Sequence, residues 1–217
     1  LRMDGTASDL KFANGQTVDS VTASISGGAA ASAPLAVKVS VTGHRAPNPD
    51  ASLASATLIA RGITSDHTLE LNGTTLSKQP VRVVATGGWR AGAAQDYAWR
   101  GSLVAAESGK PLELRLSEPA PIVIARGSLS VGPARFEARG TQFSAVEVQQ
   151  RDGRWHTAGV FEGLAPQPFD ARATAARRVV RTGAGSRQPL TLRGRWELEL
   201  TDMLTGVIIV GRTGGDI

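Results

Sequence analysis

The chain has 217 residues, of which 41% are apolar and 5% aromatic, with 25 glycines and 11 prolines. It contains no cysteine, which excludes disulfides, thiolate metal sites and a cysteine nucleophile, and it has no apolar run long enough to cross a membrane as a helix. The formal net charge is +5.

The first half of the chain predicts a succession of strands, because apolar and polar residues alternate and a strand points successive side chains to opposite faces. The segments with this pattern are Val21–Ile25, Leu35–Val41, His67–Leu71 and Val81–Ala85. Ala54–Arg61 predicts a strand whose inward face is ambiguous, and the proline-containing run His44–Asp50 predicts a loop. Asn72–Gly73 predicts a tight turn, and Gly87–Gly88 predicts the end of a strand.

The second half repeats the same logic with more turn signals. The predicted strands are Trp99–Ala105, Leu112–Leu116, Ile122–Ala125, Ser128–Val131, Arg135–Gly140, Val146–Val148, Trp155–Phe161 and Val207–Gly211. Turns are predicted at Ser108–Pro111 and Thr205–Gly206, breaks at Pro119–Pro121 and Leu164–Phe169, and a hairpin turn at Arg151–Arg154.

The clearest two-faced strand is Leu190–Leu200. Leu190, Leu192, Trp196, Leu198 and Leu200 share one parity, and threonine, arginine and glutamate residues occupy the other. Before it, Asp170 begins a segment of good helix formers, which predicts one short helix near residues 170–179. About a dozen strands without a shift in composition predict one all-β domain over residues 1–217.

From Arg172 to Arg195 the chain holds seven arginines and no acidic residue. Such a stretch suits contact with anionic lipid or nucleic acid, but no aromatic stacking residue or nucleic-acid motif accompanies it. A solvated connection is therefore the favoured interpretation, and we expect no nucleic-acid partner.

The residues that would carry catalysis are absent. Ser65, Asp66 and His67 do not form a relay, because neighbours on a strand face opposite sides. His67 shares the parity of Leu69 and Leu71, so we expect it to be a partly buried structural histidine. No pair of histidines has metal-ligand spacing, and no phosphate loop, dinucleotide fingerprint or nucleophile elbow appears. We therefore expect no enzymatic activity, no cofactor and no metal.

The apolar strand faces leave two architectures open. They either pack on each other in a closed sandwich, with a role as an adhesin, carbohydrate-binding module or spacer, or they line the groove of an open curved sheet. The inward residues are mainly Leu, Val, Ile and Ala, which suits the smooth lining of an acyl-chain groove. The expected lining residues are Leu35, Val37, Val39, Leu69, Leu71, Leu103, Leu112, Leu114, Leu192, Trp196 and Leu198.

Several of these segments match a known family in order and spacing. Gly62–Leu71 resembles the Gly-x-x-x-x-His-x-Leu-x-Leu strand of the TamB family, and Trp99–Leu103 resembles its Trp-x-Gly-x-Leu strand. Pro119–Ala120 precedes a strand as it does in that family. Trp196–Leu200, Leu204–Gly206 and Arg212–Ile217 are similar to its Trp…Gly…Arg-x-x-Gly-Asp-Leu block, with Ile217 in place of leucine. The style of strand is shared with AsmA/TamB-like periplasmic bridge proteins.

The resemblance implies a long curved, open sheet, called a β-taco or partial β-solenoid, with a hydrophobic groove. It implies an interior section of a periplasmic bridge, anchored in the inner membrane of a diderm bacterium by a segment outside this sequence. Its cargo would be phospholipid acyl chains or strands of outer-membrane proteins, in support of outer-membrane protein assembly, autotransporter secretion and lipid homeostasis. The implied partner is a TamA-like outer-membrane protein of the BamA family, reached through a C-terminal region outside this sequence. Open sheet edges also allow self-association.

Overall fold

The computed structural model describes residues 2–12, 15–28, 30–47, 52–91, 97–110, 113–165, 190–201 and 203–214. Within these ranges the chain forms fourteen strands that belong to one antiparallel sheet, which confirms the all-β expectation. The predicted helix near 170–179 lies outside the described residues. The strands are β1 (Arg2–Lys11), β2 (Thr17–Ser26), β3 (Pro34–His44), β4 (Leu53–Ile63), β5 (Asp66–Thr75), β6 (Pro80–Ala91), β7 (Tyr97–Ser108), β8 (Leu114–Leu116), β9 (Ala120–Ala125), β10 (Ser128–Ala138), β11 (Thr141–Arg151), β12 (Arg154–Leu164), β13 (Thr191–Leu200) and β14 (Leu204–Gly214).

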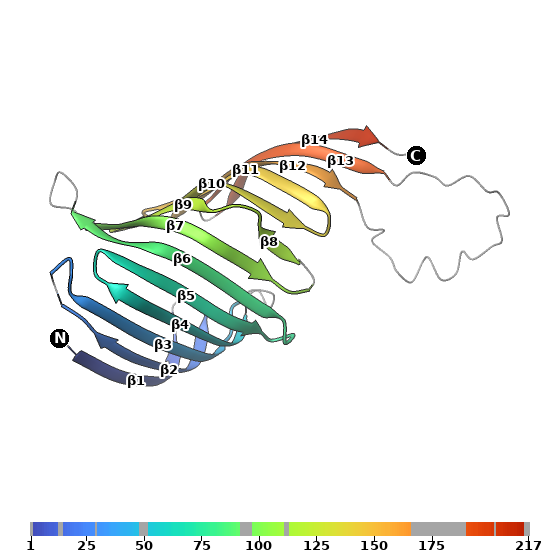
Figure 1. Ribbon diagram of the computed structural model, residues 1–217. Coiled ribbons are helices and arrows are strands. Elements are labelled where there is room, and N and C mark those ends of the chain that lie inside the picture. Colours follow the sequence, from blue (N-terminus) through green and yellow to red (C-terminus); the bar gives the residue numbers. More distant parts are fainter. Residues whose placement is uncertain are drawn as a thin grey trace.

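The topology is a meander, in which almost every strand pairs with the next one along the chain. The exception lies between β7 and β10, where two short strands, β8 and β9, together occupy one strand position. Each pairs with both β7 and β10, β9 along one half of β7 and β8 at its other end. β1 and β14 lie at opposite ends of the sheet and do not pair with each other. The sheet is therefore long, curved and open (Figure 1).

The hairpin between β11 and β12 shows how local sequence sets the fold. Asp152 and Gly153 both have positive φ, 49° and 82°, as a two-residue turn of type I′ requires. The predicted hairpin at Arg151–Arg154 is confirmed, with Arg151 and Arg154 as partners at its closed end.

Three dipeptides that contain glycine predict turns or a strand end but lie inside strands, so those predictions were wrong. β5 runs through Asn72–Gly73, β6 through Gly87–Gly88 and β14 through Thr205–Gly206. These glycines serve close approach between strands: a Cβ on Gly73 would lie 3.2 Å from the carbonyl oxygen of Ser55, and one on Gly87 would overlap the backbone of β7.

Other boundaries also differ from the prediction. Ser128–Val131 and Arg135–Gly140 join into the single strand β10, which is bent by irregular register around Gly132 at φ 106°. β8 is shorter than the predicted strand at Leu112–Leu116, and Leu112 lies outside the described residues. β1 was not predicted, because its glycine, aspartates and serine hide the alternation.

Cross-strand partners in an antiparallel sheet point to the same face, so the register shows which residues share a side. One row runs from Val37 through Ala60, Leu69 and Ala85 to Leu103. We call this side the trough face; through successive partners it continues to Phe136 and Phe161 and then to Trp196 and Ile208 on β13 and β14. The register also settles β4, whose Ala56, Leu58 and Ala60 belong to this face.

Burial on the trough face arises without a second sheet, since all described strands belong to one. Leu103, Leu116, Ala120 and Ala134 form a buried cluster where β8 and β9 share their position. Side chains in a single layer are covered only by neighbours on the same side, which the curvature brings together. The described strands therefore do not form a closed sandwich of two packed sheets.

The outer face carries ion pairs. Arg82 Nε lies 3.4 Å from Glu70 Oε1 between neighbouring strands of this face. Hydrogen bonds from the Ser24 and Arg2 side chains lower the pKa of Asp4. All of these pairs are solvent-exposed, so they contribute little to stability and mainly keep this face soluble.

Candidate functional site

The structure places the described members of the predicted lining on one face. Leu35, Val37 and Val39 on β3 connect by register to Leu69 and Leu71 on β5. The same face carries Leu103 on β7, Leu114 on β8 and three residues of β13, namely Leu192, Trp196 and Leu198. Leu112 lies outside the described residues. The described members of the predicted set therefore share one face of the sheet.

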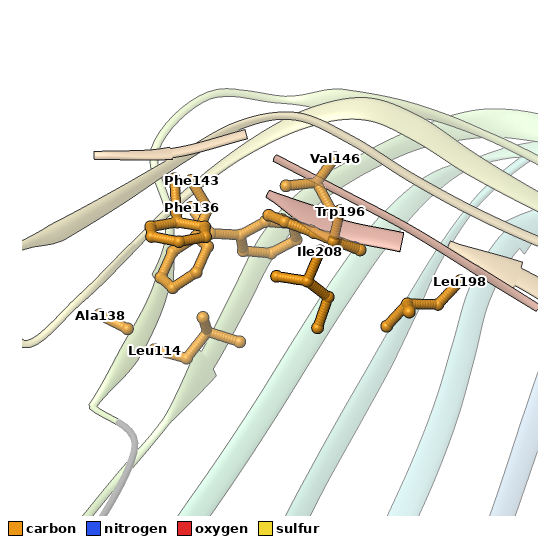
Figure 2. Close-up of a pocket in the computed structure, with 9 residues that line it drawn as sticks. Leu114, Phe136, Ala138, Phe143, Val146, Trp196, Leu198 and Ile208 are labelled. Carbon is orange, nitrogen blue, oxygen red and sulfur yellow. The ribbon is translucent and has the colours of Figure 1, made fainter. Parts of the chain in front are cut away.

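Part of this face is hollowed into a cavity, which has a volume of about 470 Å³. It lies over β8 and β10–β14, and the side chains labelled in Figure 2 gather in it. The lining residues are Leu114, Phe136, Ala138, Phe143, Val146, Phe161, Trp196, Leu198 and Ile208. Its volume is in the usual range for ligand pockets, about 300–1,000 Å³.

Three of the predicted lining residues, Leu114, Trp196 and Leu198, lie in this cavity. Leu103 is instead buried in the core cluster beneath β8 and β9. The remaining described ones are half-buried on the trough face, away from the cavity, and they are Leu35, Val37, Val39, Leu69, Leu71 and Leu192.

A row of three phenylalanines forms the centre of the cavity. Phe136 on β10 is the register partner of Phe143 on β11, and Phe143 is the partner of Phe161 on β12. The Trp196 ring meets Phe143 edge-on, at 6.1 Å between centroids and 72° between planes. It stacks on Phe161 at 6.5 Å and 26°. Figure 2 shows the rings of Phe136, Phe143 and Trp196 close together and Leu198 farther along the trough.

Two glycines allow these rings to lie along the sheet. Gly159 is the register partner of Trp196, and Gly194 is the partner of Phe161. A Cβ on Gly159 would overlap the six-membered ring of Trp196, and one on Gly194 would lie 2.6 Å from Phe161 Cζ. Because neither glycine has a side chain, the Trp196 ring lies over the backbone of Gly159, and the Phe161 ring lies over the backbone of Gly194. The Trp196 and Phe161 rings, whose planes are 26° apart, therefore lie along the floor of the cavity.

The cavity has no free polar group among its described lining side chains. The one polar atom there, the Trp196 indole N–H, donates a hydrogen bond of 3.2 Å to the Thr157 hydroxyl. The other lining side chains are aliphatic or phenyl. A molecule held here therefore finds shape and apolar contact but no hydrogen-bond partner from a side chain.

All four tryptophans lie on the trough face. Trp89 pairs with Trp99, and Trp155 pairs with Leu200 in the row that also holds Trp99. An aromatic platform on the outer face, as a carbohydrate-binding module would need, is therefore not formed by tryptophan.

Among the described residues, His67 is the most buried titratable residue of this face, at 4% exposure. Its Nε2 accepts a hydrogen bond of 2.8 Å from Trp99 Nε1, and its Nδ1 lies 3.0 Å from the Ile63 carbonyl oxygen. Both ring nitrogens are thereby occupied within the fold, as expected of a structural histidine.

The sequence prediction missed six of the lining residues: Phe136, Ala138, Phe143, Val146, Phe161 and Ile208. Five of them lie in predicted strands, where parity gives their face, whereas Phe143 lies in none of the predicted strands. Their convergence depends on register between strands, which parity within one strand does not give.

Within the described residues no group of acidic residues or histidines is arranged to hold a metal ion. The same residues include no helix long and apolar enough to span a bilayer. Comparison with known proteins finds no matching family model, no similar curated protein and no similar solved structure.

Proposed function

We propose that the trough face holds hydrocarbon chains, and that its occupant is the acyl part of a phospholipid. The observation that carries this proposal is the cavity of about 470 Å³ with nine apolar lining residues and its one indole N–H already bonded. Transfer of apolar surface from water into such a site gains roughly 25 cal/mol per Å².

The same observation disfavours a polypeptide strand as the occupant of the cavity. An extended strand brings an N–H and a C=O at every residue, and each costs free energy when it is buried without a partner. The lining side chains supply none. A strand of a client protein is better served by a sheet edge, where backbone groups are available.

The dimensions suit a track more than a pocket. The sheet has thirteen consecutive strand positions, which at a spacing of about 4.8 Å amount to roughly 58 Å along the curve. One leaflet of a bilayer has a hydrocarbon depth of about 15 Å, half of the core of about 30 Å. The trough face is thus several acyl chains long, and the apolar row from Val37 to Leu103 continues it beyond the cavity.

In this proposal the chain is a section of a periplasmic bridge of the TamB type. Lipid moves along the trough face between the inner and outer membranes, and the polar outer face meets water. The role in outer-membrane assembly and the TamA-like partner belong to the same proposal and rest on the motif resemblance.

Photo-crosslinking from two adjacent residues of β13 tests the acyl-chain site. A benzophenone amino acid replaces Leu198, which lines the cavity, or Glu197, which points to the outer face. Each variant is incubated with vesicles of phosphatidylethanolamine and phosphatidylglycerol and irradiated. Mass spectrometry of the intact protein then detects lipid adducts.

Lipid adducts at position 198 and none at 197 are the expected result. Equal adducts at both positions indicate contact with the vesicle surface, and no adduct at 198 rejects the acyl-chain site. Adducts of residual host protein in place of lipid also contradict the proposal, because they make the occupant a polypeptide.

A further inference from the structure

Exposed aromatic residues with a polar tip gather along one long border of the trough face. This border is formed by the end of β6 and the starts of β7 and β12, and we call it the aromatic border. Trp89, Tyr97 and Trp155 lie there, with exposures of 43%, 66% and 44%. Register partners join Trp89 to Trp155 across five strand spacings, roughly 24 Å. Each of these strands is paired on both sides, so the aromatic border belongs to the interior of the sheet.

The opposite border of the trough face differs in composition. Its trough-facing residues next to the turns are small, aliphatic or hydroxylic, namely Val81, Ser108, Ala138 and Thr141. It carries neither tryptophan nor tyrosine, because the remaining tryptophans of the chain are Trp99 and Trp196. Tryptophan and tyrosine prefer the boundary between hydrocarbon and water, since each ring is apolar and carries one polar group. The aromatic border therefore has the side chains that suit the level where an acyl chain meets a headgroup.

Three arginines lie at the turns of the aromatic border, and we call them the arginine patch. Arg126 lies in the turn between β9 and β10, and Arg151 and Arg154 close the hairpin between β11 and β12. The two turns are in contact, because the Asp152 N–H donates a hydrogen bond of 3.0 Å to the Gly127 carbonyl oxygen. All three arginines are exposed. Among the described residues only Arg151 has an acidic partner, Asp152 at 4.0 Å, so the patch keeps a positive charge that suits a phosphate group.

The cavity lies one acyl chain away from this patch. Phe161 in the cavity and Trp155 at the aromatic border are six residues apart on β12, roughly 20 Å along the strand. The hydrocarbon depth of one leaflet is about 15 Å. Toward the opposite border, Phe143 lies only two residues from the start of β11 at Thr141, roughly 7 Å. An acyl chain that ends in the cavity therefore has room on the side of the aromatic border only.

We propose that the phosphate of a bound phospholipid lies at the arginine patch, with its acyl chain running along β12 to the cavity. This inference rests on the acyl-chain site proposed above. Guanidinium groups bind phosphate oxygens through charge-assisted, often paired hydrogen bonds. Trp155, which directly follows Arg154, lies between the phosphate and the hydrocarbon. Each lipid then has one orientation across the trough, with its headgroup at the turn between β11 and β12.

The experiment compares two ligands that share a palmitoyl chain and differ in the phosphate. Lysophosphatidylglycerol carries a phosphate, and monopalmitoylglycerol does not. Each is added as a monomer, without vesicles, to the full chain with benzophenone at Leu198, so attraction to a membrane surface does not contribute. In R126Q/R151Q/R154Q we expect about tenfold fewer adducts with lysophosphatidylglycerol. The yield with monopalmitoylglycerol should stay unchanged, because its chain does not need the patch.

A matched control removes the same charge elsewhere. R115Q/R139Q/R193Q replaces three exposed arginines, of which Arg139 lies at the turn between β10 and β11, on the opposite border. We expect this variant to keep the wild-type yield with both ligands. Far-UV circular dichroism checks that both triple variants keep their strand content.

The possible outcomes separate this inference from the acyl-chain site. A normal yield with lysophosphatidylglycerol in R126Q/R151Q/R154Q overturns the headgroup position alone. Equal losses with both ligands also overturn it, because the arginines then support the hydrocarbon site or the fold. A loss in R115Q/R139Q/R193Q instead places the phosphate at the opposite border. Full competition by millimolar inorganic phosphate makes the patch a site for the free anion and contradicts the proposal. No adduct with either ligand in the wild type rejects the acyl-chain site, and this inference with it.

Discussion

Trp99 Nε1 donates a hydrogen bond of 2.8 Å to His67 Nε2, and the two residues belong to strands that are not neighbours. His67 lies on β5 and Trp99 on β7, with Gly87 of β6 between His67 and Gly101 in the register. A side chain on Gly87 would overlap the backbone of β7. The absence of one leaves room for the indole and imidazole rings, 6.0 Å apart between centroids, to meet across β6.

Replacing Trp99 with phenylalanine is expected to lower the free energy of unfolding by about 1–3 kcal/mol, because His67 Nε2 then stays buried without a donor. Urea denaturation followed by far-UV circular dichroism measures the effect. Trp89→Phe is the matched control, since Trp89 is the register partner of Trp99 but is 43% exposed. A loss for Trp99→Phe no larger than that for Trp89→Phe would sink this explanation.

A double variant separates the hydrogen bond from the packing. His67→Leu removes the acceptor, so the further cost of Trp99→Phe in that background is expected to be smaller than in the wild type. Strictly additive losses would assign the whole effect to lost packing of the indole.

The alternation of residues was enough to predict strands and their two faces, as β13 shows. It did not predict which residues meet. A hairpin counted outward from Asp152–Gly153 without a bulge would place Phe143 opposite Glu162. The irregular register between Ser144 and Glu147, where Ala145 has φ 50°, moves Phe143 opposite Phe161 instead. The aromatic cavity depends on that one-residue shift, which parity within a strand does not encode.

The glycines of the strands were misread for a related physical reason. A glycine followed or preceded by a polar residue predicts a turn, but the same residue also permits close approach inside a sheet. Which of the two applies depends on what the neighbouring strand presents. Gly87 faces a backbone that leaves no room for a side chain, and Gly159 faces the ring of Trp196.

Leu114→Asp is expected to lower the yield of lipid adduct at position 198 by about tenfold, equivalent to about 1.4 kcal/mol, because a carboxylate in the cavity opposes hydrocarbon. Leu192→Asp is the control, since Leu192 lies on the same face but outside the cavity lining. Both are half-buried, so both variants should retain cooperative unfolding in urea. If both unfold, the apolar face is a packing surface and not a binding surface.

The ion pair between Glu70 and Arg82 is expected to matter little. Both side chains are well exposed, and the contact is 3.4 Å, so Arg82→Ala should change the free energy of unfolding by less than about 1 kcal/mol. Lipid adducts at position 198 should be unaffected, because Arg82 is on the outer face. A clear loss of adduct in this variant would show that lipid reaches the protein through charged headgroup contacts on that face.

Gly159→Ala is the sharpest test of how the cavity is shaped. A methyl group at this position overlaps the Trp196 ring. The ring, which forms part of the cavity floor in the wild type, must therefore move into the cavity. We expect a smaller cavity, fewer lipid adducts at position 198 and a change in Trp196 fluorescence. Ordinarily glycine to alanine at a compatible site stabilises by about 0.4–1 kcal/mol, whereas here the displaced ring should make the variant less stable than the wild type. Gly211→Ala is the matched control, because a Cβ at Gly211 meets nothing within 4 Å. Unchanged lipid adducts in Gly159→Ala would show that the position of the Trp196 ring does not determine what the trough holds.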